Sequence, residues 1–90
     1  MKYPVKIRLI KETTLPDAVV PQEEKYPSGS VVSQGYMWEH TRPTLDTKFY
    51  VMATKIYPLF VTSRVNKILE STDEYIRFKT LNSIYKIEFL

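Results

Sequence analysis

Two alternating segments near the end of the sequence restrict the fold more than any other feature. Residues 75–80 and residues 84–90 each alternate apolar with charged side chains. A period of two is typical of a β-strand with one buried face. The residues between them suit a tight turn, because Asn82 tolerates the left-handed conformation that short hairpin turns favour. The sequence therefore predicts a β-hairpin with one apolar face. Its apolar residues are Ile76, Phe78, Tyr85, Ile87 and Phe89.

The position of the turn decides which residues face one another across this hairpin. A two-residue loop at residues 81–82 places Phe78 opposite Tyr85. A loop at residues 82–83 instead places the same ring opposite Ile87 and sets Arg77 across from Glu88. Both registers keep the apolar side chains together, so the sequence leaves the register open.

Further segments have the composition or the alternation of strands. They are residues 3–10, 30–38, 48–57 and 64–69. Gly35, inside the second of them, indicates a bulge or a bend. Ninety residues allow a single domain, and short connections usually join neighbouring strands. The sequence thus predicts an all-β fold, a small single-domain barrel or roll of five to six mainly antiparallel strands.

The segment 48–57 also has a helical pattern. Its apolar residues recur at i, i+3, i+4, i+7 and i+8. They are Phe49, Met52, Ala53, Ile56 and Tyr57. Its aromatic and β-branched content favours a strand, which is the interpretation we adopt. A helix at residues 46–57 would make the fold α+β. Pro58 ends or kinks either element.

Residues 12–29 lack periodicity and contain three prolines. This composition is typical of a long surface loop or arm, and we expect the whole segment to lie outside the strands.

Composition and charge exclude several classes of protein. The chain has no cysteine, which removes disulfides and thiolate chemistry. Lysine and arginine interrupt residues 1–11, so we expect no signal peptide there. The longest uncharged run, residues 26–38, is too short and too polar to span a bilayer. We therefore expect a cytoplasmic protein with no membrane partner. The net charge of +3 is spread evenly and indicates a polyanion partner only weakly.

Two short motifs resemble a known group of proteins. Residues 62–65 read Thr-Ser-Arg-Val, and residues 80–85 read Thr-Leu-Asn-Ser-Ile-Tyr. This pattern is similar to small proteins of bacteriophages and other mobile elements, in which Thr-Ser-x-Val precedes an acidic turn and Thr-x-Asn-Ser-x-Tyr. Asp46 stands where these proteins often have glycine. The group has no assigned activity, so the resemblance implies a phage-related origin and a location in the host cytoplasm.

Candidate catalytic groups are sparse. Glu39 precedes His40, the only histidine, and a carboxylate beside an imidazole can support acid–base chemistry. Adjacent strand residues point to opposite faces, so these two side chains can meet only in a loop. The clustered ligands of a metal site and a glycine-rich phosphate loop are both missing from the sequence. We expect a protein that is not an enzyme and that has no metal or cofactor.

Aromatic residues give a stronger argument for binding. The chain has seven tyrosines and one tryptophan, residue types that are enriched at protein interfaces. Tyr36 and Trp38 share one face of the strand predicted at 30–38, and Arg42 follows closely. We predict that Tyr36, Trp38 and Arg42 contact a protein partner.

The outward side of the predicted hairpin offers a second surface. Arg77, Lys79 and Lys86 would lie together there, with Lys6 and Arg8 beside them if the first strand is a neighbour. Such a row can bind a phosphate backbone, although it is more often the solvated side of a sheet.

These observations favour a small non-enzymatic binding protein that, as an inhibitor does, occupies a surface of a larger host or viral protein. The alternative is a nucleic-acid-binding small β-barrel that uses Arg77, Lys79 and Lys86. The sequence leaves the oligomeric state open.

Overall fold

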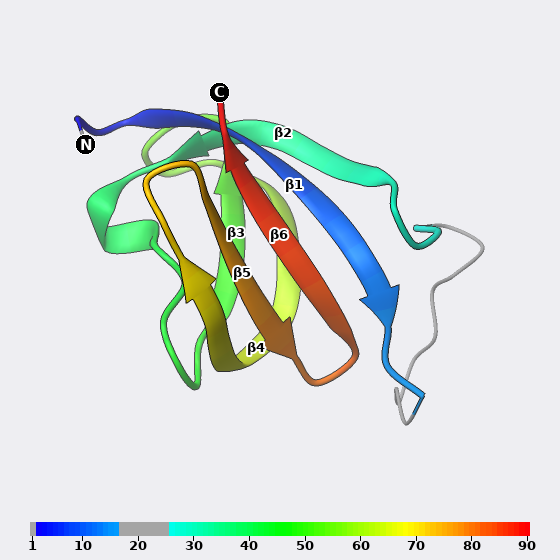
Figure 1. The fold of residues 1–90 in the computed structure, drawn as a ribbon. Coiled ribbons are helices and arrows are strands. Elements are labelled where there is room, and N and C mark those ends of the chain that lie inside the picture. The colour runs from blue at the N-terminus through cyan, green and yellow to red at the C-terminus, as the bar shows by residue number, and fades with distance from the viewer. Residues whose placement is uncertain (1, 17–25) are drawn as a thin grey trace.

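Each strand of the chain pairs with the next one, and the last strand pairs with the first. The computed structural model describes residues 2–16 and 26–90. The strands form one closed antiparallel barrel in the order β1-β2-β3-β4-β5-β6 (Figure 1). They are β1 (Val5–Thr14), β2 (Val31–Met37), β3 (Lys48–Met52), β4 (Pro58–Ser71), β5 (Tyr75–Thr80) and β6 (Ser83–Phe89), and η1 (Glu39–Thr41) is a 3-10 turn. The predicted all-β barrel is confirmed. No helix in the described part of the chain has the length and apolarity to cross a bilayer.

The C-terminal hairpin adopts the first of the two predicted registers. Phe78 lies opposite Tyr85, and residues 81–82 form the loop. The other register is wrong, since Arg77 lies opposite Lys86.

The hairpin loop differs from the expectation in its backbone conformation. Among the described residues only Asp46 (φ 67°) and Gly29 (φ 86°) have a positive φ. The left-handed conformation predicted for Asn82 is therefore wrong. The Thr80 hydroxyl replaces that geometry, because its Oγ1 accepts hydrogen bonds from the backbone N–H groups of Asn82 (3.3 Å) and Ser83 (3.2 Å).

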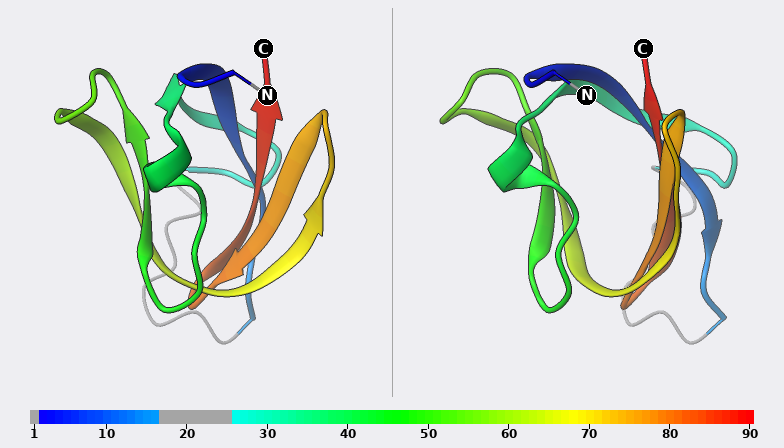
Figure 2. Two further views of the ribbon diagram at one scale, coloured as in Figure 1. Left: turned by 90° about the vertical axis from the view of Figure 1, so that its left-hand side faces the viewer. Right: turned by 60° about the vertical axis from the view of Figure 1, so that its left-hand side comes forward.

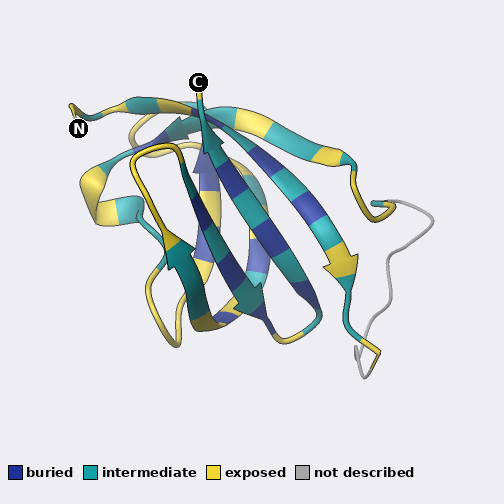
Figure 3. Ribbon diagram, in the orientation of Figure 1, coloured by how far each residue is buried: buried dark blue, intermediate teal, exposed yellow. Residues whose placement is uncertain are grey.

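The inward residues of the strands form one core. Phe78 lies between Phe49 and Tyr85, with ring centroids 5.4 and 5.6 Å apart. Buried and less buried residues alternate along β5 and β6 in Figure 3, as the sequence predicts. The buried core residues are Ile7, Leu9, Met37, Phe49, Val51, Val65, Ile76, Phe78, Tyr85 and Ile87.

The ambiguous segment 48–57 contains a strand and no helix, so the helical alternative is wrong. β3 covers only its first half and points Phe49 and Val51 inward. The second half, residues 53–57, is a tight turn in which the Ala53 N–H donates to the Tyr57 carbonyl (2.8 Å). Ile56 and Tyr57, which complete the helical pattern, therefore lie on an exposed turn rather than on a buried helix face.

β4 is a single long strand, whereas the sequence predicted an interruption at Pro58 and a strand only at 64–69. Proline is tolerated as the first residue of a strand, and Pro58 occupies that position. Two register shifts against β3 and two against β5 interrupt the pairing of β4. Its first half pairs with β3 and its second half with β5, so β4 passes from one side of the barrel to the other (Figure 2).

β1 continues four residues beyond its predicted end, so the predicted arm at 12–29 begins too early. Residues 11–14 pair with β6. The extension was hidden in the sequence because a charged residue, Lys11, occupies an inward position and is 1% exposed. Half of the predicted arm, residues 17–25, lies outside the described residues.

Gly35 is explained by close packing rather than by the predicted bulge. It pairs regularly with Ile7 of β1. A Cβ atom on Gly35 would lie 2.6 Å from the carbonyl oxygen of Met52 and 2.9 Å from Cγ1 of Val51. Glycine therefore allows β2 to approach β3, which it joins through the single described pair Tyr36 and Met52.

Candidate protein-binding face

The outer side of β3 and β4 carries an unusual share of exposed apolar side chains. Of the nine large hydrophobic residues exposed in the described part of the chain, five lie on this hairpin. We call them the β3–β4 face: Tyr50, Ile56, Tyr57, Leu59 and Val61. Tyr50 and Val61 are cross-strand partners. The most exposed are Ile56 (88%) and Tyr57 (67%), on the turn between the strands. Scattered apolar residues are normal on a surface, whereas their grouping on one hairpin makes this face the candidate interaction site.

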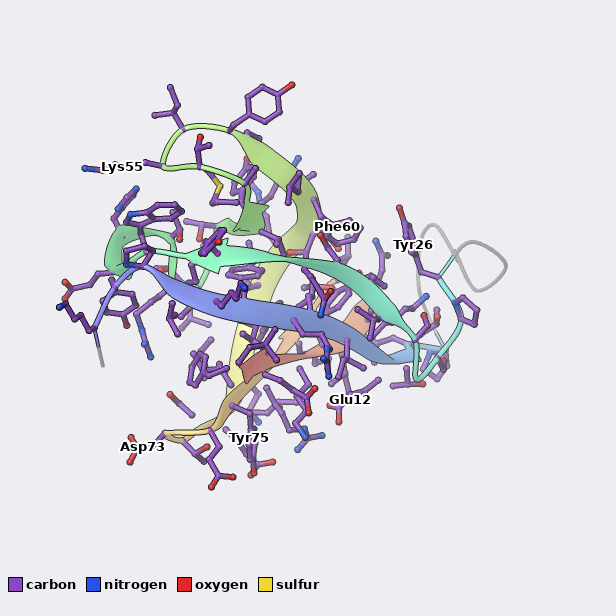
Figure 4. The ribbon with its side chains drawn as sticks, turned by 90° about the horizontal axis from the view of Figure 1, so that it is seen from above. Glu12, Tyr26, Lys55, Phe60, Asp73 and Tyr75 are labelled. Carbon is purple, nitrogen blue, oxygen red and sulfur yellow. The ribbon has the colours of Figure 1, made fainter. Side chains whose placement is uncertain are left out.

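Cations without carboxylate partners surround this face. Lys48, Lys55 and Arg64 are exposed, and none of them forms an ion pair with a described residue. Lys55 lies on the turn at one side of the molecule, and Glu12, Asp73 and Tyr75 lie at the opposite side (Figure 4). The β3–β4 face is therefore apolar with a positive rim.

A groove of about 930 Å³ runs beside the first half of β4. Tyr50, Leu59 and Val61 line it on the side of the β3–β4 face, and Lys11, Tyr26 and Tyr85 line it at the end of the barrel. The Tyr26 ring packs edge-on against Phe60, with centroids 5.4 Å apart (Figure 4). Burial raises the pKa of the Tyr85 phenol, so this group stays neutral at physiological pH.

The opposite side of the barrel has a different surface, made by β1, β5, β6 and the end of β4. We call it the ion-paired face. Arg77 donates to Glu70 and, from Nε, to Oε1 of Glu12 (2.8 Å). The Tyr75 hydroxyl donates to Glu70 (2.8 Å), and the Lys86 Nζ lies 4.7 Å from the centroid of the Tyr75 ring. Nearby, Glu88 lies 3.4 Å from Arg8 and 3.8 Å from Lys86.

These contacts shift the proton affinity of the ion-paired face. The hydrogen bond from Arg77, followed by that from Tyr75, lowers the pKa of Glu70. The hydrogen bond from Tyr75 to Glu70 also raises the pKa of the Tyr75 phenol. Glu12 and then Glu70 raise the pKa of Arg77. Each shift favours the charge state that the contacts use, so the network is internally neutralised.

The aromatic residues predicted to bind a protein share a face, as expected. Tyr36 and Trp38 have ring centroids 6.1 Å apart, while Met37 is buried on the other side of β2. Both rings are half-buried. Arg42 is directed to another group, because its Nη1 donates to the Tyr3 hydroxyl (2.5 Å). Binding by these three residues stays a prediction.

The predicted cationic row also lies on one surface. Arg77 and Lys86 are cross-strand partners, and Lys79 lies opposite Lys67 of β4. The strand β1 is a neighbour, as expected, and brings Arg8 opposite Glu88. A phosphate would have to compete with Glu12 and Glu70 for Arg77, so the arrangement gives little support to the nucleic-acid alternative.

Glu39 and His40 lie at η1 and are both exposed. No hydrogen bond joins their side chains in the described structure, so acid–base chemistry there gains no support. The described residues contain no group of three or more histidine, cysteine or acidic side chains that could hold a metal ion.

The residues of the β3–β4 face were missed from the sequence, although one signal points to them. Residues 47–69 contain four lysines or arginines and no carboxylate, a feature that they share with residues 1–11, where Arg8 pairs with Glu88. Such a stretch has no carboxylate of its own, and in residues 47–69 no ion pair with another described segment supplies one. In comparisons with known proteins, no family model, no curated protein and no solved structure matches this chain.

Proposed function

We propose that this chain is a non-enzymatic binding domain whose β3–β4 face occupies a surface on a larger protein. The observation that carries the proposal is the exposed apolar group from Tyr50 to Val61 inside a rim of unpaired cations. Protein interfaces have an apolar centre and a polar rim of this kind. The resemblance to phage proteins makes the expected partner a bacterial or viral protein.

The chemistry of the face favours a protein over a nucleic acid. Three of its five residues, Ile56, Leu59 and Val61, are aliphatic. Aliphatic side chains neither stack on bases in the way that aromatic rings do nor neutralise phosphates. They gain most from burial against the apolar side chains of another protein.

The experiment uses a photo-crosslinking amino acid placed on one of two exposed turns. Position 57 lies on the β3–β4 face, and position 73 lies on the turn at the opposite side of the barrel. In bacterial lysate, position 57 is expected to give a discrete adduct and position 73 none. Excess unlabelled wild-type protein should abolish the adduct, and excess of the double variant Ile56→Ser/Tyr57→Ser should not.

The double variant is a fair competitor, because exposed substitutions change stability by only about 0.5 kcal/mol or less. Its circular dichroism spectrum should match that of the wild type. Equal adducts from both positions, or an adduct that both competitors abolish, would show that the β3–β4 face is not the binding surface. Oligonucleotide binding that weakens with salt and survives in the double variant would instead establish the nucleic-acid alternative.

A further inference from the structure

We infer that the partner supplies an extended segment of apolar and acidic residues, which adds as a strand to the first half of β4. This inference rests on the proposed function and names the kind of contact that the β3–β4 face makes. It depends on the pairing of β4, on the groove beside it and on the charges that line the groove.

The first half of β4 has one partner strand. Residues 58–64 pair with β3, and pairing with β5 begins only at Val65. Among the described strands, none pairs with the other edge of residues 59–62. An unpaired strand edge presents backbone N–H and C=O groups that an incoming strand can satisfy.

The groove lies along this edge and ends at a polar closure. Its lining includes every residue from Pro58 to Asn66. At Ser63 the edge meets the hairpin loop, because the Ser63 hydroxyl donates to Thr80 Oγ1 (3.2 Å) and accepts from the Asn82 amide (3.3 Å). The open part of the edge is therefore residues 59–62, which is long enough for a short added strand.

The side chains along the groove select the composition of that strand. Leu59 and Val61 offer apolar contacts on one side of β4, and Phe60 offers them on the other. The charged residues that line the groove are Lys11, Lys48, Arg64 and Asp46. Lys11 is buried, so the exposed charges of the groove are Lys48 and Arg64 against Asp46. This positive balance favours an acidic segment, since complementary charge steers and stabilises a complex.

The same charges disfavour a second copy of this chain as the occupant. A symmetric dimer through this edge would bring Lys48 and Arg64 of both copies to one interface. Their mutual repulsion opposes such a contact.

The test begins with the selection of peptides from a displayed library of random decapeptides on the full chain. Peptides that bind are expected to be rich in acidic and apolar residues and to move the amide NMR signals of residues 59–62. Each selected peptide is then synthesised in two forms, N-methylated at alternate positions in one of two sets. Successive N–H groups of a strand point to opposite edges, so only one set faces β4.

Strand addition predicts unequal effects of the two sets. N-methylation of the set that faces β4 should weaken binding by about tenfold or more, because the backbone hydrogen bonds are lost, and the other set should change it by about twofold at most. Arg64→Glu should weaken binding by about tenfold. The matched control is Lys67→Glu, on the same strand but outside the groove, which should leave affinity within about twofold.

Each remaining outcome overturns the inference, and the outcomes separate it from the proposed function. If both N-methylated forms bind alike, the segment does not add as a strand although the face still binds protein. If no peptide is selected while position 57 still gives its adduct, the partner uses a folded surface. If neither experiment gives binding, both proposals fail. Sedimentation that shows a dimer lost in Arg64→Glu would assign the edge to a second copy.

Discussion

The two sides of this barrel share one core and differ in how their charges are balanced. On the ion-paired face, Arg77 meets two carboxylates, and Glu88 lies between Arg8 and Lys86. On the β3–β4 face, Lys48, Lys55 and Arg64 have no described ion-pair partner, and apolar side chains stand between them. A neutralised surface gains little from a charged partner, whereas an unneutralised apolar surface gains from both charge and burial.

The comparison teaches that a count of cations does not locate a binding surface. Each side carries several lysines or arginines, and the sequence draws attention to the row at Arg77, Lys79 and Lys86. The difference lies in the ion pairs: Glu12 of β1, Glu70 of β4 and Glu88 of β6 all form them on one side, and no described ion pair lies on the other. The unbalanced side is therefore the better candidate.

The largest expected effect tests whether the two faces are parts of one cooperative unit. Phe78 lies behind the ion-paired face and Phe49 behind the β3–β4 face, and the two rings are in contact. Phe78→Ala and Phe49→Ala should each lower the free energy of unfolding by about 3–5 kcal/mol, since both leave a cavity in the same core. Urea denaturation followed by circular dichroism measures both. Two separate transitions in Phe49→Ala would mean that β3 and β4 unfold on their own and that the two faces are independent.

An intermediate effect is expected at the contact between β2 and β3. Gly35→Ala should cost about 1–3 kcal/mol, because the new methyl group meets the rigid carbonyl of Met52. The control is Gly29→Ala, where the added Cβ meets no described atom within 4 Å beyond its chain neighbours. The positive φ then opposes the substitution, at about 1 kcal/mol. Amide NMR shifts in Gly35→Ala should concentrate in β3 and near Leu59. Wild-type stability in this variant would show that β2 does not press on the strands of the β3–β4 face.

The smallest effect concerns pH and belongs to the ion-paired face alone. The lowered pKa of Glu70 means that its carboxylate stabilises the folded state above the ordinary glutamate pKa of about 4.3 and loses this contribution as pH falls through its folded value. Wild type should thus exceed Glu70→Gln in stability at pH 7, and the difference should shrink toward zero on acidification. Added salt should also reduce the difference at pH 7. A difference that stays constant across this range would mean that Arg77 does not stabilise the Glu70 carboxylate.

The parts of the fold that the sequence predicts are those with strict alternation. In β5 and β6 every inward residue is apolar or a short hydroxyl, and charged residues such as Arg77 and Lys86 point outward. The requirement that the apolar residues of both strands share one face then limits the register of β5 and β6 to two choices. The hydroxyl of Thr80 decides between them, and its role emerges only when the loop is seen in three dimensions.

The alternation of side chains does not predict the fold where a charged residue is buried or an apolar residue is exposed. Lys11 is charged and buried, so the alternation of apolar and charged residues did not reveal the last four residues of β1. Leu59, Phe60 and Val61 are consecutive apolar residues, and no period tells which of them faces water. The β3–β4 face was missed for this reason. Tyr36 and Trp38 were correctly assigned to one face, but parity does not say how far a neighbouring turn covers them.

The pairing of the first strand with the last has a consequence for synthesis. β1 leaves the ribosome before the other strands of the barrel, and its inward residues Ile7 and Leu9 meet β6 only after those strands have emerged. Contacts between distant parts of a chain form late, because the intervening segment must lose its conformational entropy before they are made. A nascent chain that stops before Ser83 presents both β1 and β5 as open edges, which are templates for aggregation. When the hairpin between β5 and β6 forms, β6 pairs with both open edges and closes the barrel, so the nascent chain no longer exposes them.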